Sequence, residues 1–175
     1  MCYRGVASSA TLATPRESVV HLGTQIAAQQ PTDTMEHRIA YARIRAGLSQ
    51  AAMAQLIGVH RDYYKIIEKK SCERIDIDHL FGISKAASVS LSWLIYGDDP
   101  PPLVSIAGAT IGQRLRNFRV SNALSGCDIA RRAFGVNKLS SLYLWEKDQM
   151  VPELRSLRKI ADAFGFNVVS LLQPG

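Results

Sequence analysis

The chain has 175 residues, of which 47% are hydrophobic, and it carries a formal net charge of +6. These values permit one ordinary domain or two small ones with packed cores, and they exclude a wholly disordered chain. No apolar run approaches the roughly 20 residues that a membrane span needs, and no hydrophobic block follows Arg4 to form a secretory signal. Three scattered cysteines and four dispersed histidines lack the spacing of a metal site or a disulfide framework. We therefore expect no metal, no cofactor and a cytoplasmic location.

The basic excess is uneven along the chain. Residues 35–100 hold nine Lys and Arg against eight Asp and Glu, whereas residues 101–175 hold ten against five. Such an excess permits binding to nucleic acid without proving it.

Residues 1–34 form an N-terminal extension with little pattern. Thr14-Pro15-Arg16-Glu17 has the arrangement of a capping box with proline at the first helical position, and Val19, Leu22 and Ile26 follow at helical spacing. The flanks are rich in Ser, Thr and Ala. We expect this extension to be weakly helical or disordered.

Five short helices are expected between residues 35 and 99. Gly47 ends the first of them, because glycine favours the left-handed turn that stops a helix. Arg38 and Arg45 are expected on its polar face. Its apolar face consists of Ile39, Ala42, Ile44 and Ala46.

The other four helices of this unit have recognisable starts. Ser49 caps the second helix, and Gly58 separates it from a third that runs from about His60 to Lys69. Asp76 caps the fourth, and the fifth spans Ser90 to Tyr96.

A proline-rich break then divides the chain. Gly97-Asp98-Asp99-Pro100-Pro101-Pro102 cannot continue a helix and favours a stiff, extended linker, which we place at residues 100–109. The same pattern of segments recurs over residues 110–175. Neither half shows the alternation typical of strands, so the sequence predicts an all-α protein with two tandem five-helix units.

The second copy has its own helix signals. Ser125 caps its second helix, Val136-Asn137 opens its third, and Pro152 stands at the start of its fourth. Its fifth helix is expected from Val168 to Leu172. The apolar stripe of its fourth helix consists of Leu154, Leu157, Ile160 and Ala161.

The residues of the first copy stand at the spacing of a known family. Those that carry the likeness are Arg45-Ala46-Gly47-Leu48-Ser49-Gln50, Met53-Ala54, Gly58-Val59-His60-Arg61, Ile67-Glu68-Lys69 and the tail from Val89 to Gly97. Over about residues 37–97 the chain resembles the lambda-repressor-like (Cro/XRE) helix-turn-helix family of regulators. The resemblance implies a tight turn between the second and third helices, with the third helix reading DNA.

The second copy is similar to the same family over about residues 111–172, with departures. The glutamine that usually opens the second helix is replaced by Gly126. One extra residue lies on each side of Gly135, in and around the turn. We therefore expect the first copy to discriminate between sequences. The second, with Arg131 and Arg132 near the presumed DNA face, should bind phosphates with little preference or contact protein.

One side of the third helix has the composition of a DNA-reading surface. At about 100° per residue, five residues share that side: Arg61, Asp62, Lys65, Ile66 and Lys69. Arg61 suits guanine, Asp62 can accept from the cytosine amino group, and Ile66 can meet a thymine methyl. The alternative is an ordinary solvated helix face. The whole set expected at the DNA is Ser49, Gln50, His60, Arg61, Asp62, Lys65, Ile66 and Lys69 in the first copy, and Arg131, Lys138, Ser140 and Ser141 in the second.

The resemblance also implies two structural ion pairs, one in each copy. Arg43 is expected to pair with Glu68, and Arg119 with Glu146, across a helix interface. A charge pair of this kind fixes helix orientation more than it adds stability. Four aromatic residues are expected to pack in the core or at its edge, namely Tyr63, Trp93, Tyr143 and Trp145.

Together these features predict a sequence-specific regulator of transcription that binds double-stranded DNA, most simply a repressor of bacteriophage, prophage or mobile-element type. The alternative is an antitoxin or other protein that uses the repeats for protein contacts. An enzyme is not expected, because the sequence shows no nucleophile–base pair and no phosphate-binding glycine loop. The chain could grip adjacent half-sites alone or form a homodimer through its fifth helices, and no membrane partner is expected.

Overall fold

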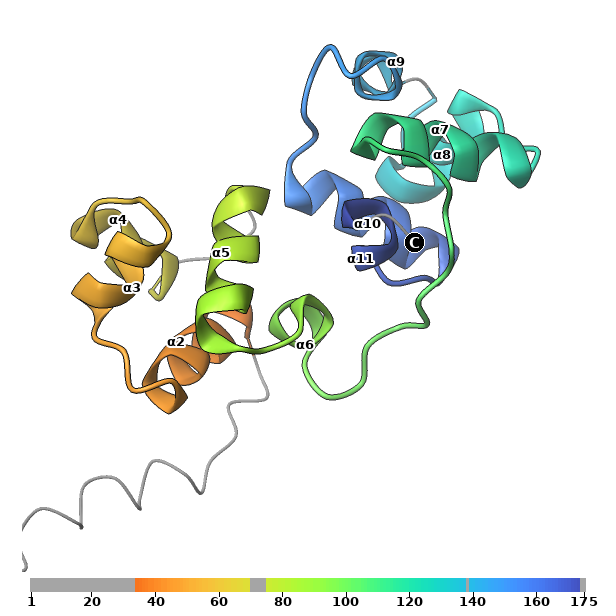
Figure 1. Cartoon of the computed structure of the whole chain (residues 1–175). Coiled ribbons are helices and arrows are strands. Elements are labelled where there is room, and N and C mark those ends of the chain that lie inside the picture. The colour runs from red at the N-terminus through yellow and green to blue at the C-terminus, as the bar shows by residue number, and fades with distance from the viewer. Residues whose placement is uncertain (1–33, 70–74, 138, 174–175) are drawn as a thin grey trace, which may run out of the picture. The chain divides into compact units, whose positions relative to one another are not determined.

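The computed structural model describes residues 34–69, 75–137 and 139–173, and all its regular elements there are α-helices (Figure 1). The described helices belong to one compact unit of the chain, Pro31–Gly175. The all-α class expected from the sequence is confirmed for these residues. The extension signals at residues 14–26 and the candidate DNA contact Lys138 lie outside them.

The first five helices begin where the sequence offers a capping side chain. They are α2 (Met35–Arg45), α3 (Gln50–Leu56), α4 (Arg61–Ile67), α5 (Ile77–Ala87) and α6 (Leu91–Tyr96). The caps are Thr34, Ser49, His60, Asp76 and Ser90, and each side chain accepts a hydrogen bond from a backbone N–H in the first turn. These bonds satisfy donors that the helix itself leaves open.

The next five helices follow the same order. They are α7 (Ile111–Ser121), α8 (Gly126–Phe134), α9 (Ser140–Glu146), α10 (Leu154–Phe164) and α11 (Val169–Leu172). The predicted start of α9 at Val136-Asn137 is wrong, because Gly135 ends α8 in the left-handed conformation and Leu139 is still extended. Pro152 likewise precedes its helix, since Glu153 is the N-cap of α10.

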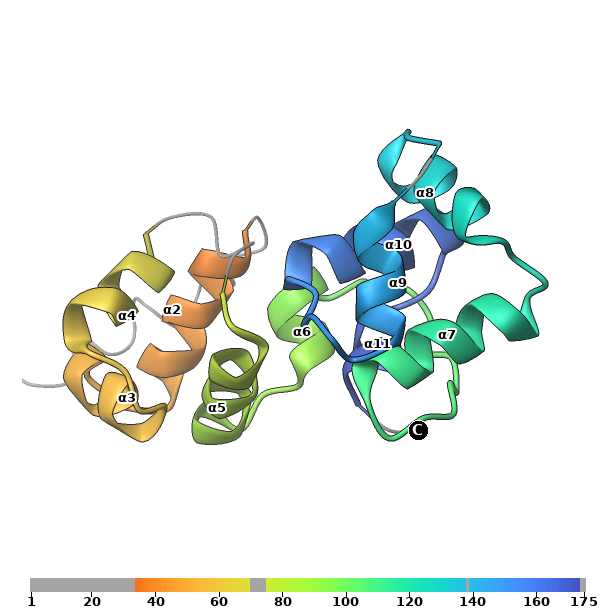
Figure 2. The same ribbon diagram turned by 90° about the horizontal axis from the view of Figure 1, so that it is seen from above.

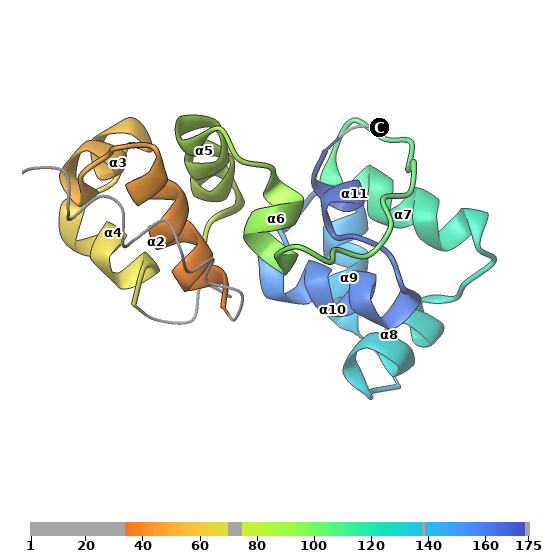
Figure 3. The same cartoon turned by 90° about the horizontal axis from the view of Figure 1, so that it is seen from below.

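The helices pack around buried apolar side chains that form one cluster running through both sets. In the first set, α2 contacts α5 and α6, and α3 lies beside α4 (Figure 1). In the second, α7 runs beside α9 and α8 packs on α10 (Figures 2 and 3). Burying a large aliphatic or aromatic side chain stabilises the fold by about 1.5–3 kcal/mol. The fully buried residues include Ile39, Met53, Tyr64, Leu80 and Leu94 in the first set, and Leu115, Ile129, Leu154, Leu157 and Ile160 in the second.

A buried arginine joins the first and last helices of each set. Arg38, only 4% exposed, donates from Nε to the carbonyl of Leu94 at 3.0 Å and from Nη2 to that of Ile95 at 2.7 Å. The predicted place of Arg38 on the polar face of its helix is therefore wrong, and Ile44, expected inside, is 42% exposed. The guanidinium is held because it satisfies carbonyls at the end of α6 that would otherwise lack donors. Burial lowers the pKa of Arg38.

The second set repeats this bond. Arg114, 3% exposed, donates from Nε to Leu171 O at 2.7 Å and from Nη2 to Leu172 O at 3.1 Å. Both arginines thus connect the opening helix of a set to carbonyls of its final helix.

The segment between the two sets is extended and hydrogen-bonded. Asn167 donates its backbone N–H to Pro102 O at 2.9 Å, and Val104 donates to Ser170 Oγ at 2.9 Å. The Asn167 side chain is 1% exposed and donates to Ser92 Oγ and Pro101 O. This buried amide holds the segments that it joins in one arrangement. Any other arrangement would leave a buried polar group without a hydrogen-bond partner.

Tyr96 adds a further bond between the sets. Its hydroxyl accepts from Val168 N at 3.2 Å and donates to Asp162 Oδ1 at 3.1 Å. Burial raises the pKa of Tyr96 to about 12, so the phenol remains protonated and able to donate.

No helix among the described residues is long and apolar enough to cross a membrane.

Candidate nucleic-acid interface

The turn between α3 and α4 brings two short helices together at a fixed angle. Gly58 adopts a φ of +73°, a conformation that costs glycine little, and Val59 N donates to Ala54 O at 2.9 Å. The corresponding turn of the second set uses Gly135 at φ +67°. In the first set this turn places α3 against α4, whereas in the second set α8 packs chiefly on α10.

The two faces of α4 differ as the sequence predicts. Tyr64 and Ile67 are buried against the core. The opposite face presents Arg61, Asp62, Lys65 and Ile66, and Lys69 lies exposed just beyond the end of the helix. The exposed face is therefore short, polar and rich in donors, which suits the edges of base pairs in a major groove.

The Asp62 carboxylate on this face is already engaged. Lys65 Nζ lies 3.0 Å from Asp62 Oδ1, and this hydrogen bond holds the pKa of Asp62 below its ordinary value. His60 caps the helix, with Nδ1 accepting from Asp62 N at 3.3 Å. Asp62 therefore positions Lys65, and Arg61 is an exposed donor at the start of the helix.

Gln50 and Ser49, both expected at the DNA, have defined roles within the fold. Ser49 Oγ accepts from Ala52 N at 3.1 Å and caps α3. Gln50 donates from Nε2 to Glu68 Oε2 at 2.7 Å. The Gln50 side chain is thereby held in one orientation at the N-terminus of α3, beside the C-terminal end of α4.

Glu68 is the centre of a buried network. Arg43 donates to it from Nε at 2.5 Å and from Nη2 at 3.2 Å, and its Nη1 donates to Leu48 O. Burial alone would raise the pKa of Glu68, but the hydrogen bonds from Arg43 and Gln50 outweigh it and lower that pKa. The hydroxyl of Tyr64 lies in the same environment, where burial and then the Glu68 charge raise its pKa. This network joins α2, α3 and α4.

The second set contains a similar ion pair with one donor fewer. Arg119 donates to Glu146 from Nε at 2.6 Å and from Nη2 at 2.7 Å, and to Leu124 O at 3.3 Å. Gly126, at the start of α8, has no side chain to add the third bond that Gln50 makes. The side chains of Arg119 and Glu146 are 23% and 11% exposed, against 12% and 5% for Arg43 and Glu68.

The exposed residues around α8 and α9 differ from those of α4. Ser140 and Ser141 form the first turn of α9, and Arg131 is exposed on α8. Arg132 lies over the Phe164 ring at 4.3 Å. The prediction that Tyr143 packs in the core or at its edge is wrong, because its side chain is 62% exposed.

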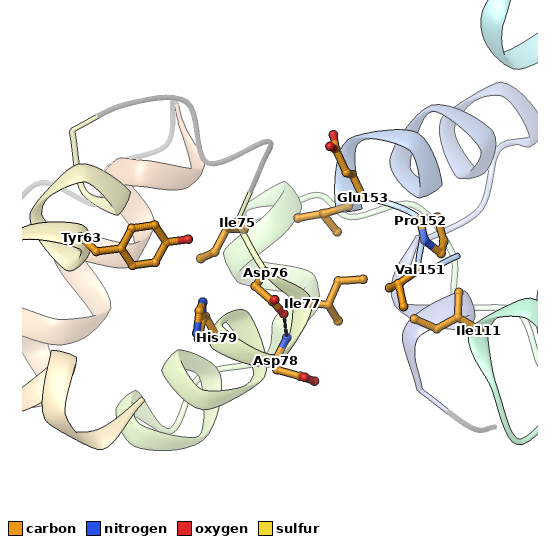
Figure 4. A pocket seen from close by; sticks show the side chains of 11 residues that line it. Tyr63, Ile75, Asp76, Ile77, Asp78, His79, Ile111, Val151, Pro152 and Glu153 are labelled. Carbon is orange, nitrogen blue, oxygen red and sulfur yellow. Dashed lines mark hydrogen bonds between the residues drawn. The ribbon is translucent and has the colours of Figure 1, made fainter. Parts of the chain in front are cut away.

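A cavity of about 550 Å³ is lined by residues of α4, α5, α7 and the approach to α10 (Figure 4). Tyr63 and His79 meet edge to face in its wall, with ring centroids 5.8 Å apart. Asp76 is occupied in capping α5 through a 2.9 Å bond from Asp78 N. Among the described residues, no group of three or more His, Cys, Asp or Glu side chains could hold a metal ion.

A known family model matches most of the first set of helices. Residues 39–94, which run from within α2 to within α6, match the family model described as helix-turn-helix. No curated protein matches the chain. The match indicates a DNA-binding regulator of transcription, and it covers the face formed by α3 and α4.

Proposed function

We propose that this chain is a sequence-specific transcriptional regulator that acts by binding double-stranded DNA, and that it is not an enzyme. The observation that carries the proposal is the outward face of α4, where Arg61, Lys65 and Ile66 project from a helix whose other side is buried. This face lies within the matched helix-turn-helix segment. Repression, of phage, prophage or mobile-element type, is the simplest mode, because it requires only that the protein occupy a promoter.

We further propose that the chain holds two helix-turn-helix domains, at residues 35–99 and 110–175, joined by residues 100–109. Repetition of individual hydrogen bonds supports this division. Arg38 and Arg114 each donate to two successive carbonyls in the last turn of a final helix. Arg43 and Arg119 each hold a glutamate at the end of the third helix of their set. The matched family model covers residues 39–94, so the assignment of the second domain rests on these bonds.

The two domains are proposed to contribute differently to DNA binding. The first presents charged and apolar groups suited to base edges, and Gln50 is held by Glu68 at the start of α3. The second presents Arg131 and Lys147, which suit phosphates. Phosphate contacts supply affinity that falls steeply with salt, whereas base contacts supply discrimination.

The alternative function is that of an antitoxin or other partner-binding protein. The large exposed surface of Tyr143 and the missing glutamine at Gly126 favour this reading for the second domain. Selection of bound duplexes from a random pool, with the whole chain, tests the proposal. Enrichment of one motif supports it, and the length and symmetry of that motif distinguish a single chain with two domains from a homodimer. Failure to enrich any sequence would contradict the proposal.

A further inference from the structure

A hollow of about 310 Å³ lies between the start of α8 and the start of α9. Its walls are mainly apolar and come from Leu139, Leu142 and Tyr143, with Gly126 and Cys127 on the opposite side. The Arg119–Glu146 pair also borders the hollow. Because that pair is internally neutralised, the hollow offers apolar surface without a net charge at its edge.

The hollow exists where the first domain has a side chain. In the first domain, Gln50 reaches from the start of α3 to Glu68. The residue at the start of α8 is Gly126, and a Cβ placed there would meet Leu142 Cδ2 at 3.6 Å, an ordinary van der Waals distance. The space is therefore large enough for a side chain that the sequence does not supply.

The outward residues of α9 are also less polar than the matching residues of α4. If Glu146 is matched to Glu68, the buried residues correspond, with Leu142 in place of Tyr64 and Trp145 in place of Ile67. On the exposed side, Leu139 then replaces Arg61, Ser140 replaces Asp62, and Tyr143 replaces Lys65. The exposed side of α9 thus carries no charged side chain before its C-cap, Lys147.

An exposed cation nevertheless lies one helical turn from a lining residue on each of the two helices. Arg131 is exposed one turn along α8 from Cys127, and positions four residues apart share a helix face. Lys147 lies one turn along α9 from Tyr143, with its Nζ 5.6 Å from the ring centre. A partner that carries negative charge next to a small apolar group would therefore be complementary to this surface.

We propose that this hollow receives the 5-methyl group of a thymine in the major groove, with phosphates meeting Arg131 and Lys147. The assignment rests on the proposed DNA-binding function and deepens it. Thymine is the base whose major-groove edge carries a methyl group, and that edge lies between two phosphate backbones. A protein partner with an acidic surface and an apolar anchor is the competing occupant. DNA is favoured because the matching surface of the first domain lies in a helix-turn-helix segment.

The expected size of the effect follows from the transfer of one methyl group out of water. Burial of one such group is worth a factor of about three to five in affinity at room temperature. Contact with a methyl group would give this domain a modest preference for thymine at one or two positions of the DNA site. Arg61 of the first domain is instead expected to recognise a base through hydrogen bonds.

The experiment uses the whole chain and its selected duplex. Each thymine is replaced in turn by deoxyuridine, which removes only the methyl group, and affinity is measured by fluorescence anisotropy. We expect about a threefold to fivefold loss at one or two positions that depend on Tyr143. In the Tyr143→Ala variant, replacing thymine by deoxyuridine at those positions of the duplex should no longer reduce the affinity. Gly126→Gln, which fills the hollow from the opposite side, should have the same effect.

Controls separate this proposal from the function on which it rests. Val120→Ala alters another exposed apolar residue of the same domain, on α7, and should leave every thymine-to-deoxyuridine ratio unchanged. Ile66→Ala should change ratios only at different positions. If the chain binds its duplex but Tyr143→Ala and Gly126→Gln alter no ratio, the methyl contact is refuted. A chain that binds no duplex refutes the DNA-binding function itself. Occupation of the hollow by a protein would appear as loss of a co-purifying partner in Tyr143→Ala with DNA binding unaltered, and would also overturn the proposal.

Discussion

Replacement of Glu68 by alanine should be among the most destabilising single changes in the first domain. The carboxylate is 5% exposed and receives three hydrogen bonds, two from Arg43 and one from Gln50. Its removal leaves the Arg43 guanidinium, itself 12% exposed, with Leu48 O as its remaining acceptor in this network. Breaking one side of a buried pair costs about 3–5 kcal/mol. For a cooperative unit of this size, that loss lowers Tm by on the order of 10 °C.

Urea denaturation followed by circular dichroism measures this cost, and the matched change in the second domain is its control. Glu146→Ala should cost less, roughly 1–3 kcal/mol, because its pair is more exposed and Gly126 adds no third donor. A midpoint for Glu68→Ala within experimental error of the natural chain would show that the network is open to water. Equal costs for the two changes would refute the argument from exposure.

The pH dependence of stability provides a second measurement on the same network. The folded pKa of Glu68 lies below its ordinary value, so the network stabilises the protein at neutral pH and this contribution is lost as the pH falls through the lowered pKa. The difference in unfolding free energy between the natural chain and Glu68→Gln should therefore be largest above about pH 5, and it should shrink in stronger acid. A difference that grows on acidification would contradict the assigned direction of the shift.

Three further predictions concern other parts of the chain. Arg61→Ala should weaken binding to the selected duplex by about 1–3 kcal/mol and relax preference at one base position, as measured by anisotropy with single-base variants; unchanged preference at every position would show that Arg61 does not read a base. Asn167→Ala should lower stability by about 1–3 kcal/mol, because it leaves Ser92 Oγ and two backbone groups without this partner, whereas an unaltered urea midpoint would mean that water replaces the amide. A chain that starts at Met35 loses the capping hydroxyl of Thr34 and should be about 1 kcal/mol less stable with the same DNA affinity; a large loss of affinity would instead assign a DNA contact to residues 1–34.

The sequence predicted helices and their starts well, because these depend on local chemistry. A hydroxyl or carboxylate one residue before an apolar periodicity satisfies open backbone donors wherever the helix lies, so Ser49, Asp76 and Ser125 were identifiable as caps. The outward face of α4 followed from the same periodicity. The local sequence pattern was therefore sufficient to predict the helices and the outward face of α4.

The sequence was less informative where a side chain serves a distant backbone. Arg38 looks like a solvated residue until the ends of α6 and α2 are brought together, and its acceptors are 56 and 57 residues away. One signal could have located it: an arginine recurs at the same place in the second copy, as Arg114. The late start of α9 has no local signature, because its N-cap Leu139 makes no side-chain capping bond.

The long-range bonds of Arg38 and Arg114 also bear on the order in which the chain acquires its structure during synthesis. The acceptors of Arg38 are complete once Ile95 has been added, whereas those of Arg114 require Leu172. At about 5–20 residues per second, the second pair of acceptors appears about 4–15 s after the first. Arg38 can therefore find the end of α6 before any competing helix end exists. Refolding from denaturant removes this temporal separation, and each arginine then meets two similar acceptors, so we expect exchanged or swapped pairings to slow refolding in the test tube relative to synthesis.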